Sequence, residues 1–136
     1  MENVIPFYFF DTAGDPGAVD KYKREEFESG KGKKLRCRSC EHIITEDSKR
    51  ISIENSHSHN RINPAGFEYH IQCFSFAPGC TPFGEATSEY TWFSGYRWQV
   101  AVCNSCSEHL GWYFRGETSF YGLITIRLVE EDDRLN

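Results

Sequence analysis

Two pairs of cysteines carry the clearest chemical signal in the sequence. Cys37 and Cys40 form one Cys-x-x-Cys motif, and Cys103 and Cys106 form another. Each motif brings two sulfur atoms toward one point, and two such motifs supply the four ligands of a tetrahedral structural zinc site. The long stretch between the motifs means that the metal would join distant parts of the chain. We therefore predict one structural Zn²⁺ ion per chain, with disulfide or redox use of these cysteines as the alternative.

The remaining cysteines and two nearby histidines give weaker signals. Cys73 lies in a predicted strand, Tyr69 to Phe76, and Cys80 in a turn. A free cysteine is commonly a small buried apolar residue, although either thiol would become a nucleophile beside a suitable base. His42 and His109 follow the two cysteine motifs closely. Because four thiolates already complete a zinc site, we expect packing or capping roles for both histidines rather than metal ligation.

All three tryptophans lie near the second cysteine motif, as Trp92, Trp98 and Trp112. If this motif forms the tip of a hairpin, reflection about its centre places Trp98 opposite Gly111, one step out of register with Trp112. Alternation along the two strands then allows the indoles to form three walls of one small pocket. The alternative is that the tryptophans are ordinary core residues, which is the commoner role of a tryptophan in a β domain.

The walls of such a pocket restrict the ligands that it can bind. Indole faces attract cations such as methylated ammonium groups, for which Glu89 is a nearby acid, and they also stack on flat neutral rings. In an extended segment the C=O of Tyr90 and the N–H of Trp92 point to the same side. That edge complements a cyclic imide or lactam, which carries N–H beside C=O. No Ser/His/Asp or paired-carboxylate constellation is visible, so we expect no catalysis.

Composition and charge exclude several classes of protein. The 136 residues suit a single domain, and the aromatic content of 15% favours strands. The net charge of −5 argues against a general nucleic-acid binder, because such proteins are usually basic. No stretch approaches the roughly 20 apolar residues that span a bilayer, and the first residues lack the basic charge of a signal peptide. We expect a cytoplasmic protein without nucleic-acid or membrane partners.

Strand signals separated by frequent turns dominate the chain after residue 35. We expect a polar loop at 56–60 and a turn at 81–84. The prediction is a mostly β domain over residues 36–129, preceded by a partly ordered extension (1–35) and followed by an acidic tail (130–136). The main strand candidates are Phe67 to Phe76, Arg97 to Val102, Gly111 to Arg115 and Phe120 to Leu128.

A set of motifs around the two cysteine pairs has a distinctive order. The run from Tyr90 to Trp98, YTWFSGYRW, precedes the second cysteine motif, and HLGWYF from His109 to Phe114 follows it. The first cysteine motif, the turn NPAG that begins at Asn63 and the run FYGL that begins at Phe120 complete the set. Together these motifs resemble the thalidomide-binding (CULT) domain family of cereblon, and the resemblance covers about residues 36 to 129.

The resemblance implies a fold and a ligand class. The fold is the β-tent, in which two antiparallel sheets meet at an angle and are tied by one Cys₄ zinc site. The ligand site is a tri-tryptophan pocket, with Phe114 as a further wall, that binds glutarimide and related cyclic imides. Cyclic-imide-modified termini belong to the same ligand class.

The resemblance also assigns roles to single positions. Main-chain groups at Tyr90 and Trp92 hold the imide in this family, and Asn63 lies on the loop that closes over the ligand. Tyr90 stands where the animal proteins have histidine, so we expect the imide to be held here through the backbone, which is indifferent to side-chain identity.

The resemblance also bears on the expected partners, and several alternative functions stay open beside it. The animal proteins are ubiquitin-ligase substrate receptors through a separate domain that binds the ligase adaptor, and we expect no such domain in 136 residues. The chain then resembles a stand-alone, bacterial-type member. Rival hypotheses are a methyl-lysine cage, a nucleic-acid zinc ribbon, and an enzyme like methionine sulfoxide reductase B, which would need Cys73 or Cys80 as its nucleophile.

Overall fold

The computed structural model describes residues 32–131 of the chain. The predicted extension lies outside these residues apart from 32–35. The predicted acidic tail likewise lies outside them, apart from Glu130 and Glu131.

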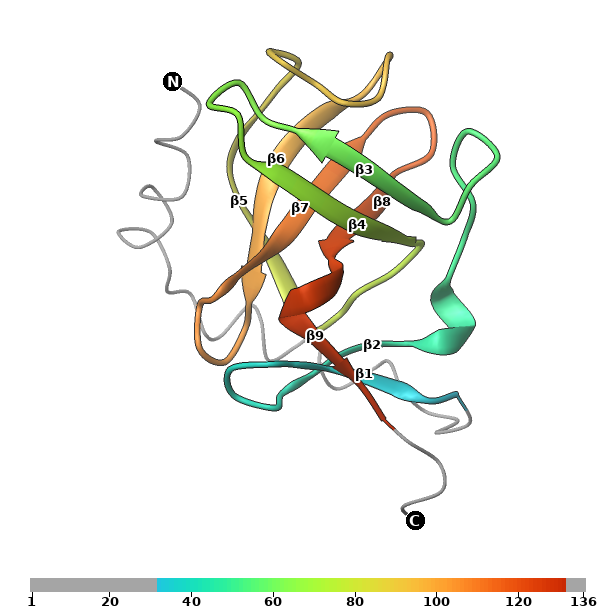
Figure 1. Cartoon of the computed structure of the whole chain (residues 1–136), viewed down its shortest axis with the longest axis vertical. Helices are drawn as coiled ribbons and strands as arrows, with labels where there is room; N and C mark the ends of the chain where they lie inside the picture. Colours follow the sequence, from blue (N-terminus) through green and yellow to red (C-terminus); the bar gives the residue numbers. More distant parts are fainter. Residues whose placement is uncertain (1–31, 132–136) are drawn as a thin grey trace.

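Two antiparallel sheets form the described part of the chain (Figure 1). The smaller sheet has the strand order β2-β1-β9, and the larger sheet has the order β3-β4-β8-β7-β6-β5. Figure 1 shows the small sheet at one end of the molecule, with β9 entering it directly from the short 3₁₀ turn η3 (Thr125–Arg127). A second 3₁₀ turn is η2 (Asp47–Lys49). The strands are β1 (Lys34–Cys37), β2 (Ile43–Glu46), β3 (Ser58–Ile62), β4 (Glu68–Phe74), β5 (Cys80–Thr87), β6 (Arg97–Cys103), β7 (His109–Arg115), β8 (Phe120–Ile124) and β9 (Leu128–Glu130).

The expectation of a mostly β fold with two antiparallel sheets is confirmed. The predicted strands over β4, β6 and β7 are also confirmed, with small shifts at their ends. A single strand from Phe120 to Leu128 is wrong, because η3 interrupts it and β9 pairs with β1 in the other sheet. The turn predicted at 81–84 lies inside β5.

The polar loop predicted at 56–60 is also wrong, since β3 covers most of it and pairs with β4. The strand was not predicted because its sequence is polar and shows no apolar alternation. The ring of His59 lies edge-on to Phe93 with 5.2 Å between ring centroids, and the guanidinium of Arg61 lies 4.9 Å from the centre of the same ring. These side chains use their flat faces and apolar stems to cover an aromatic core residue, so the strand needs no apolar alternation.

The hairpin of β6 and β7 has a different register from the predicted one. Trp98 pairs with Phe114 and Val100 pairs with Trp112, where reflection about the cysteine motif had placed Trp98 opposite Gly111. The turn is longer than the motif itself, and the register shifts between Ala101 and Val102. Trp98 and Trp112 therefore lie on the same face of the sheet, two residues apart along the ladder.

Two apolar clusters occupy opposite faces of the large sheet. Along β6, Val100 and Val102 belong to one cluster and Ala101 to the other, as strand alternation requires. The cluster around Ala101 also contains Leu35 and Ile44 of the small sheet, so it fills the space between the sheets. Leu35 is 2% exposed and lies within β1, so the ordered sheet extends beyond the predicted boundary at residue 36.

Candidate functional site

The four predicted metal ligands come together at one point. The Sγ atoms of Cys37 and Cys106 are 3.7 Å apart, and those of Cys40 and Cys103 are 3.6 Å apart. All four sulfur atoms lie within 4.8 Å of one another. Sulfur atoms at about 2.3 Å from a tetrahedral zinc ion would lie about 3.8 Å apart. The spacing therefore fits one metal ion held by four sulfur atoms.

The two cysteine motifs are built alike. The N–H of Cys37 donates to His42 O (2.9 Å) and its C=O accepts from Glu41 N–H (2.8 Å). Cys103 repeats this arrangement, because its N–H donates to a carbonyl five residues later and its C=O accepts from Ser107 N–H, both at 2.9 Å. Glu41 and Ser107 have positive φ values of 68° and 67°. The repeated turn explains why both pairs of sulfur atoms converge.

The pKa values of three of these thiols are shifted in different directions. Burial raises the pKa of Cys103, and it raises the pKa of Cys106 to about 11. The pKa of Cys40 is lowered. Burial alone would raise it, but a backbone hydrogen bond at His42 and hydrogen bonds with neighbouring side chains outweigh the effect of burial. Because thiolates are the metal ligands, metal binding here would release protons.

Among the described residues, the group that can hold a metal consists of these cysteines alone, without His42 or His109. His109 packs instead. Its Nε2–H donates to Gly111 O at 3.0 Å, and its ring lies edge-on to Trp112 with 4.9 Å between centroids. Burial lowers the pKa of His109 to about 4, and the positive charge of Arg127 contributes to the shift.

The tryptophans lie together on one face of the large sheet. Trp92 precedes β6, Trp98 lies on β6 and Trp112 on β7. The rings of Trp92 and Trp112 are edge-to-face, with centroids 4.7 Å apart and an interplanar angle of 71°. Trp98 packs against the same apolar cluster and, like Trp92, stays partly exposed. The three indoles thus share one cluster, in which two of them are in direct ring contact.

Hydrogen bonds fix the positions of two of the indoles. Trp98 Nε1–H donates to Glu89 O at 2.8 Å, which holds the loop between β5 and β6. Trp92 Nε1–H donates to Ile62 O at 3.2 Å, which connects this loop to the end of β3. The adjacent Asn63 closes its own turn, since its side-chain oxygen accepts from the N–H groups of Ala65 and Phe67 at 3.0 and 2.9 Å. Asn63 therefore shapes the loop beside Trp92.

Two predicted ligand residues differ in their surroundings from the sequence expectation. Phe114 is 1% exposed and stacks on Phe120 with 5.0 Å between centroids, so its ring is surrounded by core residues. Tyr90 has φ of +58°, so the extended backbone expected at this position is wrong. The tyrosine side chain is 57% exposed.

The backbone beside Trp92 nevertheless retains hydrogen-bonding capacity. Neighbouring groups are engaged, because Thr91 N–H donates to Ser88 O and Phe93 N–H donates to Thr91 Oγ1. The C=O of Tyr90 and the N–H of Trp92 form no hydrogen bond with any of residues 32–131. Within the described part of the chain, one acceptor and one donor are therefore unoccupied next to the indoles.

Sequence reasoning missed Tyr69 as a member of this site. Its ring lies 5.1 Å from that of Trp112 and 6.1 Å from that of Trp92, and it packs against both. A signal was available, because alternation along the predicted strand places Tyr69 on the same face as Ile71 and Cys73. Both of these residues belong to the cluster that contains Trp112.

The two cysteines outside the metal group are buried. Cys73 and Cys80 are 0% and 3% exposed. Burial raises the pKa of Cys73 to about 12 and raises that of Cys80 as well. Both thiols are therefore protonated at neutral pH, and neither is an activated nucleophile.

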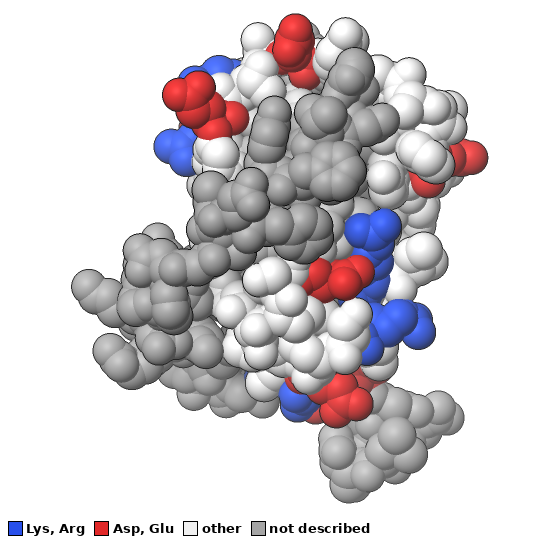
Figure 2. Space-filling view, turned by 90° about the vertical axis from the view of Figure 1, so that its left-hand side faces the viewer, with Lys and Arg blue, Asp and Glu red and all other residues white. Residues whose placement is uncertain are grey.

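Charged residues of the described chain occur in mixed groups. Lys34 pairs with Glu46 at 3.0 Å and Arg36 with Glu131 at 3.2 Å. Figure 2 shows one face of the molecule, on which Lys and Arg lie beside Asp and Glu. The helical segments within residues 32–131 are all too short to cross a membrane.

Comparison with known proteins identifies a relationship over part of the chain. No protein-family model matches it. The chain is 47% identical over 32 residues to protein cereblon of Drosophila willistoni, which covers 24% of this chain and 5% of that protein. It is 34% identical over 53 residues to protein cereblon of Danio rerio (39% and 12%) and 30% identical over 84 residues to that of Gallus gallus (54% and 19%). The chain is thus similar to fragments of cereblon over 24% to 54% of its length.

The similarity to cereblon concerns a small share of those proteins, since the chain spans 5% to 19% of the length of the three relatives. Together with the four-cysteine site, it supports a cereblon-like region that can hold one structural metal ion.

Proposed function

We propose that the four cysteines hold zinc and that the tryptophan site binds a cyclic imide without catalysing a reaction. Four sulfur ligands at tetrahedral spacing suit Zn²⁺, and the site has no open position for a substrate. The metal would then be structural. Its role is to fix β6 and β7, which carry two of the three indoles.

The observation that carries the imide proposal is the combination of ring and backbone groups at Trp92. The Trp92 and Trp112 rings stand edge-to-face at 4.7 Å, and the free Tyr90 C=O and Trp92 N–H lie in the same loop. An imide ring stacks on indole and offers N–H and C=O to such groups. The resemblance to the CULT family and the similarity to cereblon support the same ligand class.

A calorimetric titration with glutarimide tests this proposal. We expect saturable binding to the wild type, and about fivefold weaker binding to Trp98→Ala, because a stacked ring contributes about 1 kcal/mol. Phe76→Ala is the matched control, since Phe76 is 40% exposed and lies outside the tryptophan cluster. Circular dichroism shows that each variant is folded. Equal binding to wild type and Trp98→Ala would overturn the proposal.

Methylated ligands separate the imide proposal from its closest rival. N-methylglutarimide keeps the ring but lacks the N–H donor, so we expect it to bind at least tenfold more weakly than glutarimide. A trimethyl-lysine peptide carries a cation and no imide edge. Tighter binding of this peptide than of glutarimide would favour a methyl-ammonium cage instead.

The proposal of a non-catalytic role is supported by the two remaining thiols. Cys73 and Cys80 are buried and protonated, so they lack the properties of a reductase nucleophile. Methionine sulfoxide reduction that is lost in Cys73→Ser or Cys80→Ser would contradict this. The stand-alone, bacterial-type character and the absence of a ligase-adaptor partner stay predictions.

A further inference from the structure

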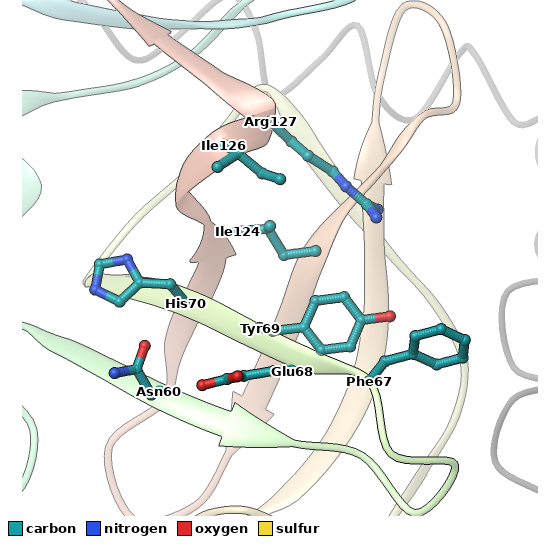
Figure 3. Close-up of a pocket in the computed structure, with 8 residues that line it drawn as sticks. All are labelled: Asn60, Phe67, Glu68, Tyr69, His70, Ile124, Ile126 and Arg127. Carbon is teal, nitrogen blue, oxygen red and sulfur yellow. The ribbon is translucent and has the colours of Figure 1, made fainter.

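A groove of about 580 Å³ runs between β4 and η3 (Figure 3). This volume lies within the range of small-molecule sites. Its apolar walls come from Ile124 and Ile126 on one side and from the rings of Phe67 and Tyr69 on the other. Ile126 is 70% exposed and Phe67 is 61% exposed. Large apolar side chains that gather in a groove and face solvent are typical of a binding site.

One cation lines this groove without a carboxylate partner. Arg127 is half-buried, and its Nη1–H donates to His109 O at 2.8 Å. Within residues 32–131 its guanidinium forms no ion pair, whereas Arg36 and Arg50 pair with acidic side chains. No described residue occupies the N–H groups of the Nε and Nη2 atoms of Arg127. A half-buried guanidinium interacts strongly with an anion, because the local dielectric constant is lower than that of water.

The polar groups of the groove are divided between its two ends. In Figure 3 the Arg127 side chain extends from η3 toward the end where Tyr69 and Phe67 lie. Glu68 points in the opposite direction, toward Asn60. The acidic side chain is thus directed away from the guanidinium, so the Arg127 end suits an anion and the middle suits an apolar group.

We propose that this groove binds a small organic carboxylate with an apolar body. The carboxylate lies on the free N–H groups of Arg127, whose planar fork matches two carboxylate oxygens. The body packs against Ile124, Ile126 and the ring of Tyr69. The groove shares Tyr69 with the tryptophan site, but none of the tryptophans lines it, and the proposal does not depend on imide binding.

The ligand side of the proposal is tested with 4-phenylbutyrate and its amide, 4-phenylbutyramide, by calorimetry on the wild-type chain. The two probes have nearly the same shape and differ in charge. We expect the carboxylate to bind at least tenfold more tightly, because the amide loses the charge-assisted hydrogen bonds. Equal affinity, or no binding of the carboxylate at millimolar concentration, would overturn the proposal.

The protein side is tested with variants in the groove. Arg127→Gln should reduce 4-phenylbutyrate affinity at least tenfold, with Arg97→Gln, an exposed arginine outside the groove, as the matched control. Arg127 also donates a hydrogen bond to His109 O, so its substitution can disturb the fold. A second variant at an exposed position avoids this problem. Ile126→Asp places a like charge beside the ligand at a position that is 70% exposed, and we expect a similar loss.

Two further results decide where the probe binds and what it represents. Trp98→Ala should leave 4-phenylbutyrate affinity unchanged, and a loss equal to that of Ile126→Asp would place the probe in the tryptophan site and overturn the proposal. A peptide that ends in phenylalanine with a free carboxylate should bind no more tightly than 4-phenylbutyrate. Binding tenfold tighter would overturn the small-molecule assignment in favour of a peptide terminus.

Discussion

The protonation state of His109 depends on its position behind Trp112. Its Nε2–H donates to Gly111 O, and its ring packs edge-on to the indole. Burial, with a contribution from the charge of Arg127, lowers its pKa to about 4. The imidazole is therefore neutral at pH 7, where it packs against Trp112 without adding charge to the tryptophan cluster.

This shift predicts a pH dependence of stability. An unfolded histidine has a pKa of about 6.5, so between pH 6.5 and 4 the unfolded chain binds the proton and the folded chain does not. The contribution of neutral His109 to the free energy of unfolding is therefore complete above pH 6.5. It is lost as the pH drops toward 4, which lowers the free energy of unfolding by up to about 3 kcal/mol. We expect His109→Gln to flatten this slope in urea unfolding measured with excess zinc. A slope identical to that of the wild type would contradict the assignment.

Gly79 allows the chain before β5 to approach β2 closely. Its N–H donates to Ile44 O at 2.9 Å. A β-carbon at this position would collide with Ile43 O and would lie 2.5 Å from Ile44 Cα. The contact lies where the two sheets meet, so neither partner can move without disturbing the cluster between them.

We therefore expect Gly79→Ala to destabilise the protein by about 2 kcal/mol or more. Gly84→Ala is the matched control, since Gly84 has φ of +81° but no atom within 4 Å of the point that an added β-carbon would occupy, and backbone strain alone costs about 1 kcal/mol. Chemical denaturation measures both. Equal losses in the two variants would show that close packing at Gly79 is unimportant.

At the level of elements, the two cysteine turns bring their sulfur atoms together by the same backbone conformation. Each turn ends with a residue other than glycine at positive φ, Glu41 in the first and Ser107 in the second. Such a conformation is strained for residues with a β-carbon. The geometry of the metal site thus includes a local cost in both turns.

Ser107→Gly should relieve this strain and stabilise the protein by up to about 1 kcal/mol, offset in part by the greater freedom of glycine in the unfolded chain. Ser105→Gly is the control within the same turn, because Ser105 has no positive φ. Thermal unfolding of the zinc-loaded variants tests the difference. A Ser107→Gly variant that is less stable than Ser105→Gly would contradict the expectation.

For the whole molecule, the four cysteines and the apolar cluster between the sheets both connect the small sheet to the large sheet. Cys37 and Cys40 lie at the turn between β1 and β2, and Cys103 and Cys106 lie at the turn between β6 and β7. A bound metal would therefore connect the small sheet to the large one. The apolar cluster that contains Leu35 of the small sheet reinforces the same junction.

We expect the purified protein to contain about one zinc ion per chain, measured by elemental analysis. Removal by a strong chelator should lower the melting temperature by roughly 10 °C or more. The reason is that binding of a structural zinc ion contributes directly to the free energy of folding, by about 10 kcal/mol in small zinc domains. Cys106→Ser should lose zinc, while Cys73→Ser, outside the metal group, should retain it. A melting temperature that is unchanged after complete zinc removal would contradict a structural role.

Much of this organisation followed from local features of the sequence. Cysteine spacing identified the four sulfur atoms that come together, because a Cys-x-x-Cys turn is a local structure whose two sulfur atoms point the same way wherever the turn lies. Strand composition and turn signals likewise identified β4, β6 and β7. The grouping of the tryptophans was expected from the sequence, but the common face of Trp98 and Trp112 depends on the register of β6 and β7.

Other features depend on contacts between distant residues, and only the tertiary structure fixed them. β3 is polar and forms a strand because His59 and Arg61 cover Phe93. The hairpin register depends on a shift between Ala101 and Val102 that alternation does not reveal. The place of Tyr69 beside the indoles and the position of Arg127 in the groove likewise follow from the pairing of strands. The sequence determined which side chains can ligate a metal, stack on a ligand or carry charge. Packing between the strands and sheets determined which of them lie together, because burial and contact partners are set by residues that are distant along the chain.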